Sequence, residues 1–559
     1  MDIPRYALIA ASILLGMMLL GEWTQFSAER NAVDQLATPL VSERAASPVA
    51  DLPATVPVNQ GSLNDSDLPS VAPEAGSTQA LPSSLVSVFT DTLEVVIDLE
   101  GGDVVGAALK RFPLTLEDPE QPFVLLERNE RRTYIAQSGL VGPDGIDQPA
   151  RAVYSTAEPA YIQRPGEPLE VALQWQGEAP DLIAQKVFRF EPGSHIISVQ
   201  HIITNRSDST LQMAPFAQLK RDGSAAPTNS DSGMGMRPFL GAAMTQPEQR
   251  FVKFDFEEIA DEPFAADIPG GWVAMLQHYF VSAWVPASDQ SYRYRTRHTT
   301  SGFNIAGFTG PVFSVAPGET HSVTTQLYVG PKNQHVLSEL APHLDLVVDY
   351  GWLWWIAQPL FWLLTLIQSV VINWGVAIIV LTILVKLAFF QLSAASYRSM
   401  ARMRKVQPRI MAIREEYAND KAKQSQAMME LYKKEKINPL GGCLPILIQM
   451  PVFIALYWVL MESVELRQAP FALWIDDLSA MDPYFVLPLL MGASMYYMQK
   501  LNPAPPDPMQ AKIMQWMPVV FTFFFLWFPS GLVLYWLCNN LLSMGQQYVI
   551  NRRIERGAL

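Results

Sequence analysis

Short segments in which apolar and polar residues alternate recur through residues 85–345. The clearest are LEVVIDL (93–99), LEVALQWQ (169–176), HIISVQHIITN (195–205) and HSVTTQLYVG (321–330). Alternation with a period of two, punctuated by Gly, Pro and Asp, is typical of strands that bury one face. We therefore predict a large antiparallel β-sandwich over these residues.

An apolar stretch from Tyr6 to about Gly21 follows Arg5 at the start of the chain. No small-residue cleavage pattern comes after it, so we predict that residues 1–29 form an uncleaved signal anchor, with a cleaved signal peptide as the alternative. Residues 30–84 are rich in Pro, Ser and Ala and bury too little apolar surface to fold. This composition predicts a disordered linker.

Long apolar segments predict membrane-spanning helices within residues 374–548. Five of these form a helical core, and the anchor adds a sixth span. The expected spans are at about residues 6–23, 374–392, 443–461, 484–498, 514–528 and 532–548. The predicted fold class is a polytopic α-helical membrane protein with a large exported β-domain.

A Trp-rich apolar segment at residues 351–375 raises the question of a seventh span. Counting it would export the basic loop 393–438, whereas loops rich in Lys and Arg stay cytoplasmic. We therefore predict that residues 346–373 form an amphipathic helix in the outer interface, broken at Pro359. Both chain termini are then cytoplasmic, including a short basic tail at residues 549–559.

Charge divides the chain in the same way. The 559 residues carry a net charge of −14, yet residues 349–559 contain 18 Lys and Arg against 13 Asp and Glu, so the acidic excess belongs to the exported part. Cys443 and Cys538 both lie in the apolar part, so the exported part forms no disulfide.

Catalytic motifs are missing from the sequence. The β-rich part has no HExxH or GxSxG motif, and the five C-terminal spans contain no Asp, Glu or His. We therefore predict no enzyme, no cofactor and no metal site, and we exclude a carboxylate proton relay in the membrane.

Lys386 lies inside the apolar run VLTILVKLAFF (380–390), about two turns from the cytoplasmic end of its span. Snorkelling of its long side chain to the headgroups is one explanation. The other is a wet, positively charged cavity open to the cytoplasm, because this span and its neighbours carry polar stripes. The residues expected to line this cavity are Thr382, Lys386, Gln449, Gln515, Tyr535, Asn539, Ser543 and Gln546.

The loop 393–438 predicts a helical hairpin whose first helix begins at Pro408 and whose second ends near Lys436. The positive-inside rule alone explains its charges; recruitment of clients is the alternative, to which its methionines add adaptable apolar surface. The expected recruitment residues are Arg402, Arg404, Lys405, Arg409, Arg414, Met428, Met429, Lys433 and Lys434.

A cation in a cavity that faces the cytoplasm attracts acidic polypeptide on its way outward, and apolar span surfaces beside it accept a hydrophobic segment. The residues therefore predict insertion of membrane proteins without a nucleotide. A lipid scramblase, or a solute transporter with a specific small ligand, is the alternative.

Three long stretches resemble the YidC/Oxa/Alb family of membrane protein insertases. They are NWGVAIIVLTILVKLAFF (from residue 373), NPLGGCLPILIQMPVF (from 438) and DPMQAKIMQWMPVVFTFFFLWFPSGLVLYWLCNN (from 507). With GGWVAMLQHYF (270–280), the likeness covers nearly the whole chain and matches the Gram-negative layout. In that layout the exported, periplasmic domain resembles a β-supersandwich.

The resemblance implies a hydrophilic groove open to the cytoplasm and to lipid, with one basic residue on the second span, usually Arg and here Lys386. It places Thr382 in that groove and gives Tyr535 and Trp536 a role in substrate contact. It also implies a chaperone of the bacterial inner membrane. Its partners would be nascent inner-membrane proteins, the phospholipid bilayer, the Sec translocon with its accessory subunits and, weakly, the ribosome; no nucleic acid is expected to bind.

Overall fold

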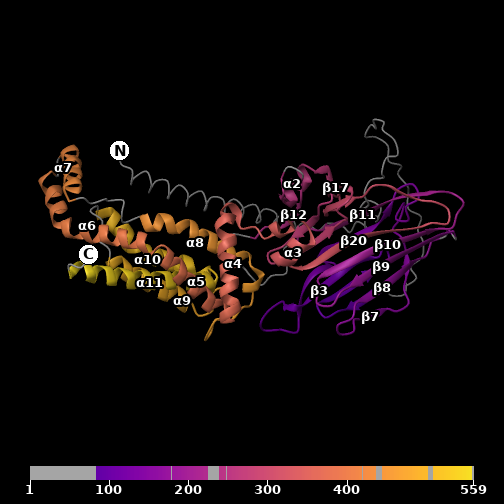
Figure 1. Ribbon diagram of the computed structural model, residues 1–559, viewed down its shortest axis with the longest axis horizontal. Helices are drawn as coiled ribbons and strands as arrows, with labels where there is room; N and C mark the ends of the chain where they lie inside the picture. The colour runs from indigo at the N-terminus through magenta and orange to yellow at the C-terminus, as the bar shows by residue number, and fades with distance from the viewer. Residues whose placement is uncertain are drawn as a thin grey trace, which may run out of the picture. The chain divides into compact units, whose positions relative to one another are not determined.

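The computed structural model describes residues 84–177, 179, 181–224, 238–246, 249–417, 420–435, 444–501 and 508–556. The predicted signal anchor, nearly all of the predicted linker and Cys443 lie outside these residues. Figure 1 shows that strands dominate the described chain as far as β20, with the short helix α2 among them, and that helices dominate after it.

The alternating segments form two sheets. The first has 11 strands, with β19 (Phe313–Val315) paired to β11 off the main path. Its order is β14 (Ala265–Pro269), β17 (Ser291–His298), β18 (Asn304–Thr309), β11 (Leu211–Arg221), β5 (Thr133–Val141), β4 (Pro122–Arg128), β3 (Asp103–Pro113), β2 (Leu93–Asp98), β1 (Leu85–Phe89) and β7 (Ala160–Ile162).

The second sheet has nine strands. Its order is β13 (Val252–Phe254), β12 (Gly241–Met244), β15 (Val273–Leu276), β16 (Phe280–Val285), β20 (Thr320–Pro331), β10 (Ile196–Asn205), β9 (Leu182–Phe190), β8 (Leu169–Trp175) and β6 (Tyr154–Ser155). Neighbouring strands run antiparallel throughout the described sheets, apart from the parallel pair of β1 and β7.

The four segments singled out in the sequence are confirmed as strands β2, β8, β10 and β20. In β10 the side chains alternate between buried and half-buried along the whole strand, because successive residues of a strand point to opposite faces. The period-two pattern therefore corresponds to a strand in a sheet that packs one face against the core.

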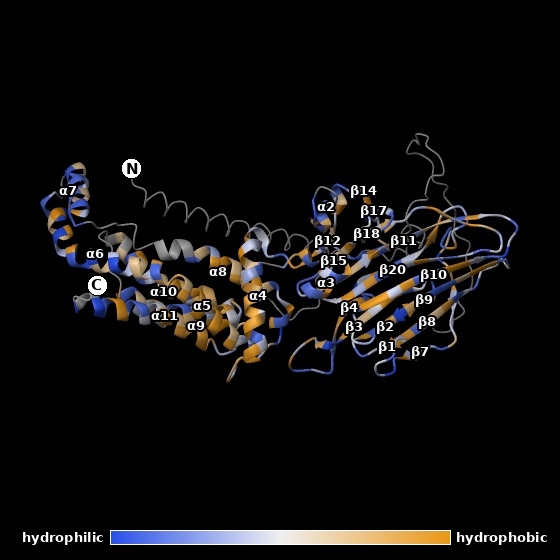
Figure 2. Cartoon of the chain, in the orientation of Figure 1, coloured by the Kyte–Doolittle hydropathy of each residue, from blue (hydrophilic) through white to orange (hydrophobic). Residues whose placement is uncertain are grey.

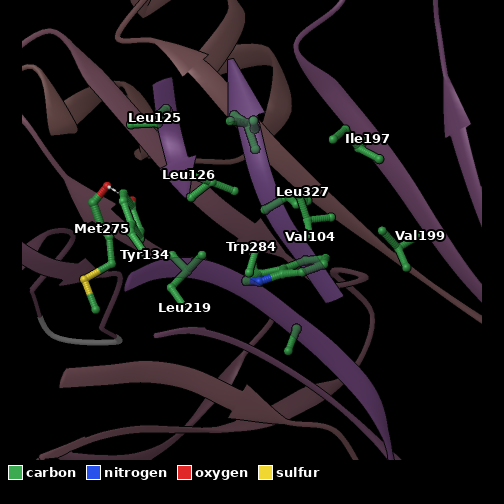
Figure 3. Packing of buried hydrophobic residues seen from close by; sticks show 14 of the residues in the cluster. Val104, Leu125, Leu126, Tyr134, Ile197, Val199, Leu219, Met275, Trp284 and Leu327 are labelled. Atoms are coloured by element: carbon green, nitrogen blue, oxygen red, sulfur yellow. Dashed lines mark hydrogen bonds between the residues drawn. The ribbon is translucent and has the colours of Figure 1, made fainter. Parts of the chain in front are cut away.

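Apolar side chains from both sheets share one core (Figure 3). Tyr134 and Leu219 come from the first sheet and Trp284 from the second, and all three are fully buried. The polar atoms of the aromatic residues are paired: Tyr134 donates to the carbonyl oxygen of Met275 (3.3 Å), and Trp284 Nε1 donates to that of Gln218 (3.1 Å). Burial therefore leaves neither group without a hydrogen bond.

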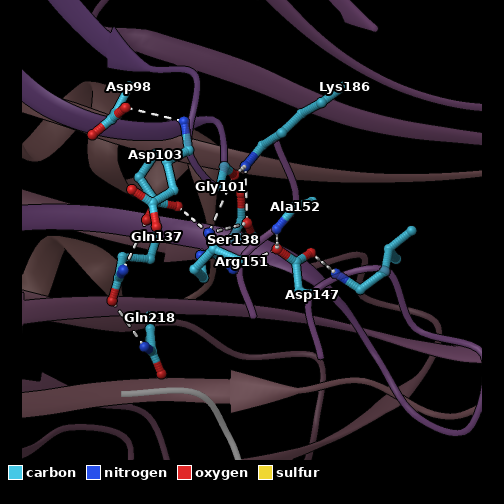
Figure 4. Close-up of polar contacts among 12 residues, drawn as sticks. Asp98, Gly101, Asp103, Gln137, Ser138, Asp147, Arg151, Ala152, Lys186 and Gln218 are labelled. Atoms are coloured by element: carbon cyan, nitrogen blue, oxygen red, sulfur yellow. Dashed lines mark hydrogen bonds and ion pairs between the residues drawn. The ribbon is translucent and has the colours of Figure 1, made fainter. Parts of the chain in front are cut away.

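A cluster of charged side chains lies buried in the β-rich part (Figure 4). Arg151 forms ion pairs with Asp103 and with Asp147, the latter at 2.8 Å. Lys186 Nζ donates to two backbone carbonyl oxygens, 2.9 and 3.0 Å away. Burial lowers the pKa of Lys186 to about 7, because water no longer solvates the charged form.

The other regular elements of the described chain are helices. Two short ones, α2 (Phe256–Asp261) and α3 (Gln334–Leu340), belong to the β-rich part. The others are α4 (Trp354–Val371), α5 (Trp374–Ala388), α6 (Phe390–Glu416), α7 (Lys421–Lys434), α8 (Leu444–Glu462), α9 (Val486–Leu501), α10 (Pro508–Phe524) and α11 (Ser530–Glu555). Buried apolar residues of α4, α5, α8, α9 and α11 form one shared core.

One helical segment of the described chain, Gly351–Val371, is both long and apolar enough to cross a membrane alone. The pair α5 and α6 meets the same criterion together, but it bends by 66° at its break. Gln449–Glu462 and Ala511–Trp527 are apolar but shorter. The segment that meets the criterion is the one for which the sequence analysis predicts an interfacial position.

Two helix boundaries differ from expectation. Pro359 does not break α4, and α6 does not begin at Pro408 but runs through it from Phe390. A proline inside a helix frees the carbonyl oxygen four residues earlier, on Trp355 and on Arg404. Both of those residues lie on exposed parts of their helices.

The turn between α4 and α5 is set by two residues. Ile372 ends α4 with a positive φ of 60°, and the side chain of Asn373 caps α5 by accepting from Val376 N at 3.0 Å. Asparagine is among the preferred N-cap residues because its oxygen satisfies a free amide of the first turn. This cap fixes where α5, the helix that carries Lys386, begins.

Candidate functional site

Lys386 lies in the last turn of α5 and reaches two other helices. Its Nζ donates to Gln449 Oε1 of α8 (3.2 Å) and to Ser543 Oγ of α11 (2.8 Å). The side chain is half-buried. The cation is therefore tied into the helical core by two hydrogen bonds.

Asn539 completes the arrangement. Gln449 Nε2 donates to Asn539 Oδ1, and Ser543 Oγ donates to the carbonyl oxygen of Asn539 at 2.6 Å. Asn539 and Ser543 are four residues apart on α11, so they share one face of that helix. We call Lys386, Gln449, Asn539 and Ser543 the Lys386 cluster.

The Lys386 cluster contains a cation but no anion. Among the described residues, no carboxylate lies within ion-pair distance of Lys386 Nζ, and both of its acceptors are neutral oxygens. An ammonium group has three donor hydrogens. Two of them are used within the described part of the chain, and the third has no acceptor there.

Aromatic rings lie further along the same helices. Tyr535 is buried and its ring lies 6.2 Å from that of Phe453, at an interplanar angle of 24°. Trp536 is half-buried and meets Phe453 edge to face, with the ring centroids 4.4 Å apart. These contacts join α8 and α11 through an apolar layer.

Three other residues expected at this site make no described hydrogen bond with the Lys386 cluster. Thr382 is buried and donates back to the carbonyl oxygen of Ile378 in its own helix (2.6 Å). Gln546 donates to the carbonyl oxygen of Phe390 (3.2 Å), next to the bend between α5 and α6. Gln515 is exposed on α10.

A second polar contact between helices was not predicted from the sequence. Asn540 Nδ2 donates to Ser494 Oγ at 3.0 Å, and both residues are buried. Asn540 follows Asn539 directly, so it points to a different neighbour and joins α11 to α9. The available signal was Ser494 directly after the apolar run VLPLLMGA at the start of α9, because polar residues in apolar helices usually bind another helix.

The helical hairpin α6 and α7 has a small core of its own. Val406 and Ile410 are buried, and half-buried residues of both helices, among them Met403 and Met428, pack against them. Arg409 Nη1 forms an ion pair with Glu435 Oε1 at 2.6 Å across the hairpin. Met428 thus packs within the hairpin, whereas the sequence analysis expects it on a surface for clients.

Most of the other predicted recruitment residues lie on the hairpin surface. Arg414 is half-buried, and Arg404 donates to the carbonyl oxygen of Leu501 at the end of α9. The exposed members of the predicted set are Arg402, Arg404, Lys405, Arg409, Met429, Lys433 and Lys434. Figure 2 shows the contrast between the hydrophilic α7 and the hydrophobic α5 and α9.

Comparison with known proteins covers both parts of the chain. The family described as "YidC periplasmic domain" matches residues 85–363, and the family described as "60Kd inner membrane protein" matches residues 366–557. The "Membrane protein insertase YidC" of Marinomonas sp. (strain MWYL1) is 50% identical over 563 residues, and both chains are covered completely. Its counterpart in Azotobacter vinelandii (strain DJ) is 49% identical over 574 residues, again over 100% of both chains.

A solved structure described as an active YidC insertase, with its first transmembrane domain resolved, is 18% identical to this chain. It covers 84% of this chain and 93% of its own, with a TM-score of 0.37. The two full-length relatives extend over the β-rich and the helical part alike.

Proposed function

The chain belongs to the YidC membrane protein insertases, and from this membership we propose that its clients pass the Lys386 cluster on their way into the bacterial inner membrane. Insertases of this family act on nascent membrane proteins and are not enzymes. The exported β-rich part is the periplasmic domain. The route of the client through the helices is our proposal.

The observation that supports this route is the pairing of Lys386. Its ammonium is held by the neutral side chains of Gln449 and Ser543, and one donor hydrogen has no acceptor among the described residues. A client carboxylate would supply the anion that none of the described residues gives this cation. Hydrogen bonds to charged groups contribute about 1.5 to 3 kcal/mol, more than neutral ones.

The proposed membrane arrangement has six spans. The anchor, α5, α8, α9, α10 and α11 cross the bilayer, α4 lies in the outer interface, and the hairpin α6 and α7 with both termini is cytoplasmic. The exposed bases of the hairpin support this orientation through the positive-inside rule. In this arrangement the hairpin meets clients first, and the Sec translocon and ribosome are further proposed partners.

The energetics favour a route through polar side chains. A charge at the centre of a bilayer costs about 2.5 to 3.5 kcal/mol on insertion scales. A hydrophilic groove formed around the Lys386 cluster would lower this cost, because it offers hydrogen bonds and water to the acidic outer segment of the client. The apolar segment of the client then moves sideways into lipid along the helix surfaces.

Proteoliposomes test this proposal. The measurement is the insertion rate of a single-span client with an acidic outer tail, with Lys386→Ala, Lys386→Glu and Lys386→Arg compared with the unchanged protein. Loss of one charge-assisted hydrogen bond predicts a rate lower by roughly tenfold or more for Lys386→Ala. We expect a stronger loss for Lys386→Glu, and retention for Lys386→Arg.

The matched control is Lys512→Ala, which removes an exposed lysine of α10 outside the Lys386 cluster. Its insertion rate is expected to stay at that of the unchanged protein. Equal rates for Lys386, Lys386→Ala and Lys386→Glu would contradict the proposed receptor for acidic segments.

A further inference from the structure

A buried ion pair joins the periplasmic domain to the end of α8. Lys332 directly follows strand β20, and Glu462 is the last residue of α8. Lys332 Nζ lies 3.3 Å from Glu462 Oε2, and the two side chains are only 3% and 8% exposed. The carbonyl groups at the C-terminus of a helix repel a carboxylate, so Glu462 depends on the cation for its place there.

Other residues of the periplasmic domain hold the same helix end. His278, in the turn between β15 and β16, donates from ring Nε2 to the carbonyl oxygen of Met461 at 2.8 Å. Just beyond the helix, Arg467 donates to the carbonyl oxygens of Pro113 and Leu114 at 2.6 and 3.2 Å. Three separate segments of the domain therefore contact this end of α8 and the chain that follows it.

The same helix supplies Gln449 to the Lys386 cluster. Gln449 and Glu462 lie on one continuous helix, 13 residues apart, which corresponds to about 20 Å at 1.5 Å per residue. A helix held at one end transmits a shift or rotation along its length. The contact between Gln449 and Lys386 thus depends on where the ion pair holds the other end of α8.

We propose that Lys332 and Glu462 are a positioning pair through which the periplasmic domain fixes α8, and with it the contact between Gln449 and Lys386. This inference rests on the proposed function of the Lys386 cluster in insertion. The pair touches no client itself. It acts through the placement of α8.

Two variants separate positioning from simple stability. Lys332→Met leaves the Glu462 carboxylate buried and unpaired, which destabilises the folded protein. The double variant Lys332→Met/Glu462→Met removes both charges, and such apolar replacements of buried ion pairs are often neutral or stabilising. The double variant therefore keeps the fold but lacks the pair.

The position of α8 is measured by crosslinking in the full-length protein. Cysteines replace Gln449 and Asn539, whose side chains are hydrogen-bonded between α8 and α11, in a background with Cys443→Ala and Cys538→Ala. The rate of disulfide formation under mild oxidation reports how the two helices face each other. Client insertion is measured separately, in proteins that retain Gln449 and Asn539.

We expect the rates of crosslinking and of client insertion to be severalfold lower in Lys332→Met and in the double variant alike. The melting temperature should be lower in Lys332→Met alone. The control Arg151→Met breaks a buried ion pair inside the periplasmic domain, so it lowers the melting temperature without changing the crosslinking rate. The positioning role is wrong if the double variant forms the crosslink, or inserts clients, at the rate of the protein that retains Lys332 and Glu462. If the Lys386 variants insert clients at the unchanged rate, the proposed function is wrong. The crosslinking rates would still show whether the ion pair positions α8.

Discussion

The positive charges of Arg151 and Lys386 are stabilised in different ways. In the periplasmic domain Arg151 meets two carboxylates, Asp103 and Asp147. In the helical part Lys386 meets only neutral oxygens among the described residues. Arg151 therefore has its counter-charges inside the folded domain, whereas the described residues give Lys386 none.

Removing Arg151 is expected to destabilise the periplasmic domain strongly. Arg151→Met leaves Asp103 and Asp147 buried without their cation, and breaking a buried pair in this way costs about 3 to 5 kcal/mol. Chemical unfolding followed by Trp fluorescence measures the loss. The control Arg293→Met breaks an exposed pair with Asp267 and is expected to change stability by less than about 0.5 kcal/mol. Equal stability of the two variants would contradict the structural role of Arg151.

Lys186 predicts a pH dependence of stability. Its ordinary pKa of 10.5 is lowered to about 7 in the folded protein, so between these values the unfolded chain binds more protons than the folded one. The free energy of unfolding therefore rises with pH in this window, by up to about 1.4 kcal/mol per pH unit. Lys186→Met removes this contribution. Unfolding curves measured from about pH 7 to about pH 9 should show this rise of the unfolding free energy with Lys186 present and not in Lys186→Met. The same pH dependence in both proteins would contradict a lowered pKa of Lys186.

At the scale of the element, the long helix α6 shows what local patterns miss. The sequence places a helix start at Pro408, because proline suits a first turn. The helix instead continues from Phe390 to Glu416, since the apolar residues around Val406 and Ile410 pack against α7. Packing of the hairpin therefore outweighs the one hydrogen bond that proline removes.

Truncating one side chain tests whether the small core of the hairpin holds α7 in place. Ile410→Ala removes a buried side chain and is expected to cost the hairpin about 2 to 5 kcal/mol. Hydrogen exchange across α7 should then become faster. The neighbouring change Met411→Ala alters a residue that is 51% exposed and should leave exchange unchanged. Unaltered exchange of α7 in Ile410→Ala would show that α7 is held by other contacts.

For the whole molecule, the sequence predicts where strands lie along the chain better than it predicts which strands pair with each other. The period-two pattern identifies β2, β8, β10 and β20 because it depends on neighbouring residues only. It does not reveal that β11 lies between β5 and β18, because such pairing joins strands far apart in sequence.

The same limit applies to the site. The spacing on α11 predicts that Asn539 and Ser543 lie together, and the structure joins both to Lys386 or Gln449. The spacing of polar residues within one helix does not indicate which neighbouring helix faces them. Gln515 therefore looked equivalent to Gln449 in the sequence, although it is exposed on α10.

The proposed orientation of the whole protein predicts a dependence on membrane potential. Moving one negative charge outward across the bilayer gains about 2.3 kcal/mol per 100 mV when the inside is negative. Adding one Asp to the outer tail of a client should therefore speed insertion into energised proteoliposomes, and adding one Lys should slow it. The same clients compared without a potential provide the control. Equal effects of Asp and Lys would contradict outward passage of an acidic tail.

The neutral side chain of Gln449 has an evolutionary consequence. Glutamine and glutamate codons differ by one nucleotide, and a glutamate at this position would place a carboxylate beside Lys386 Nζ, where Gln449 Oε1 now lies at 3.2 Å. The chain would then supply its own anion and compete with every acidic client at a local concentration that no client reaches. A self-inhibited insertase is thus a single mutation away, so selection on insertion should keep position 449 free of negative charge.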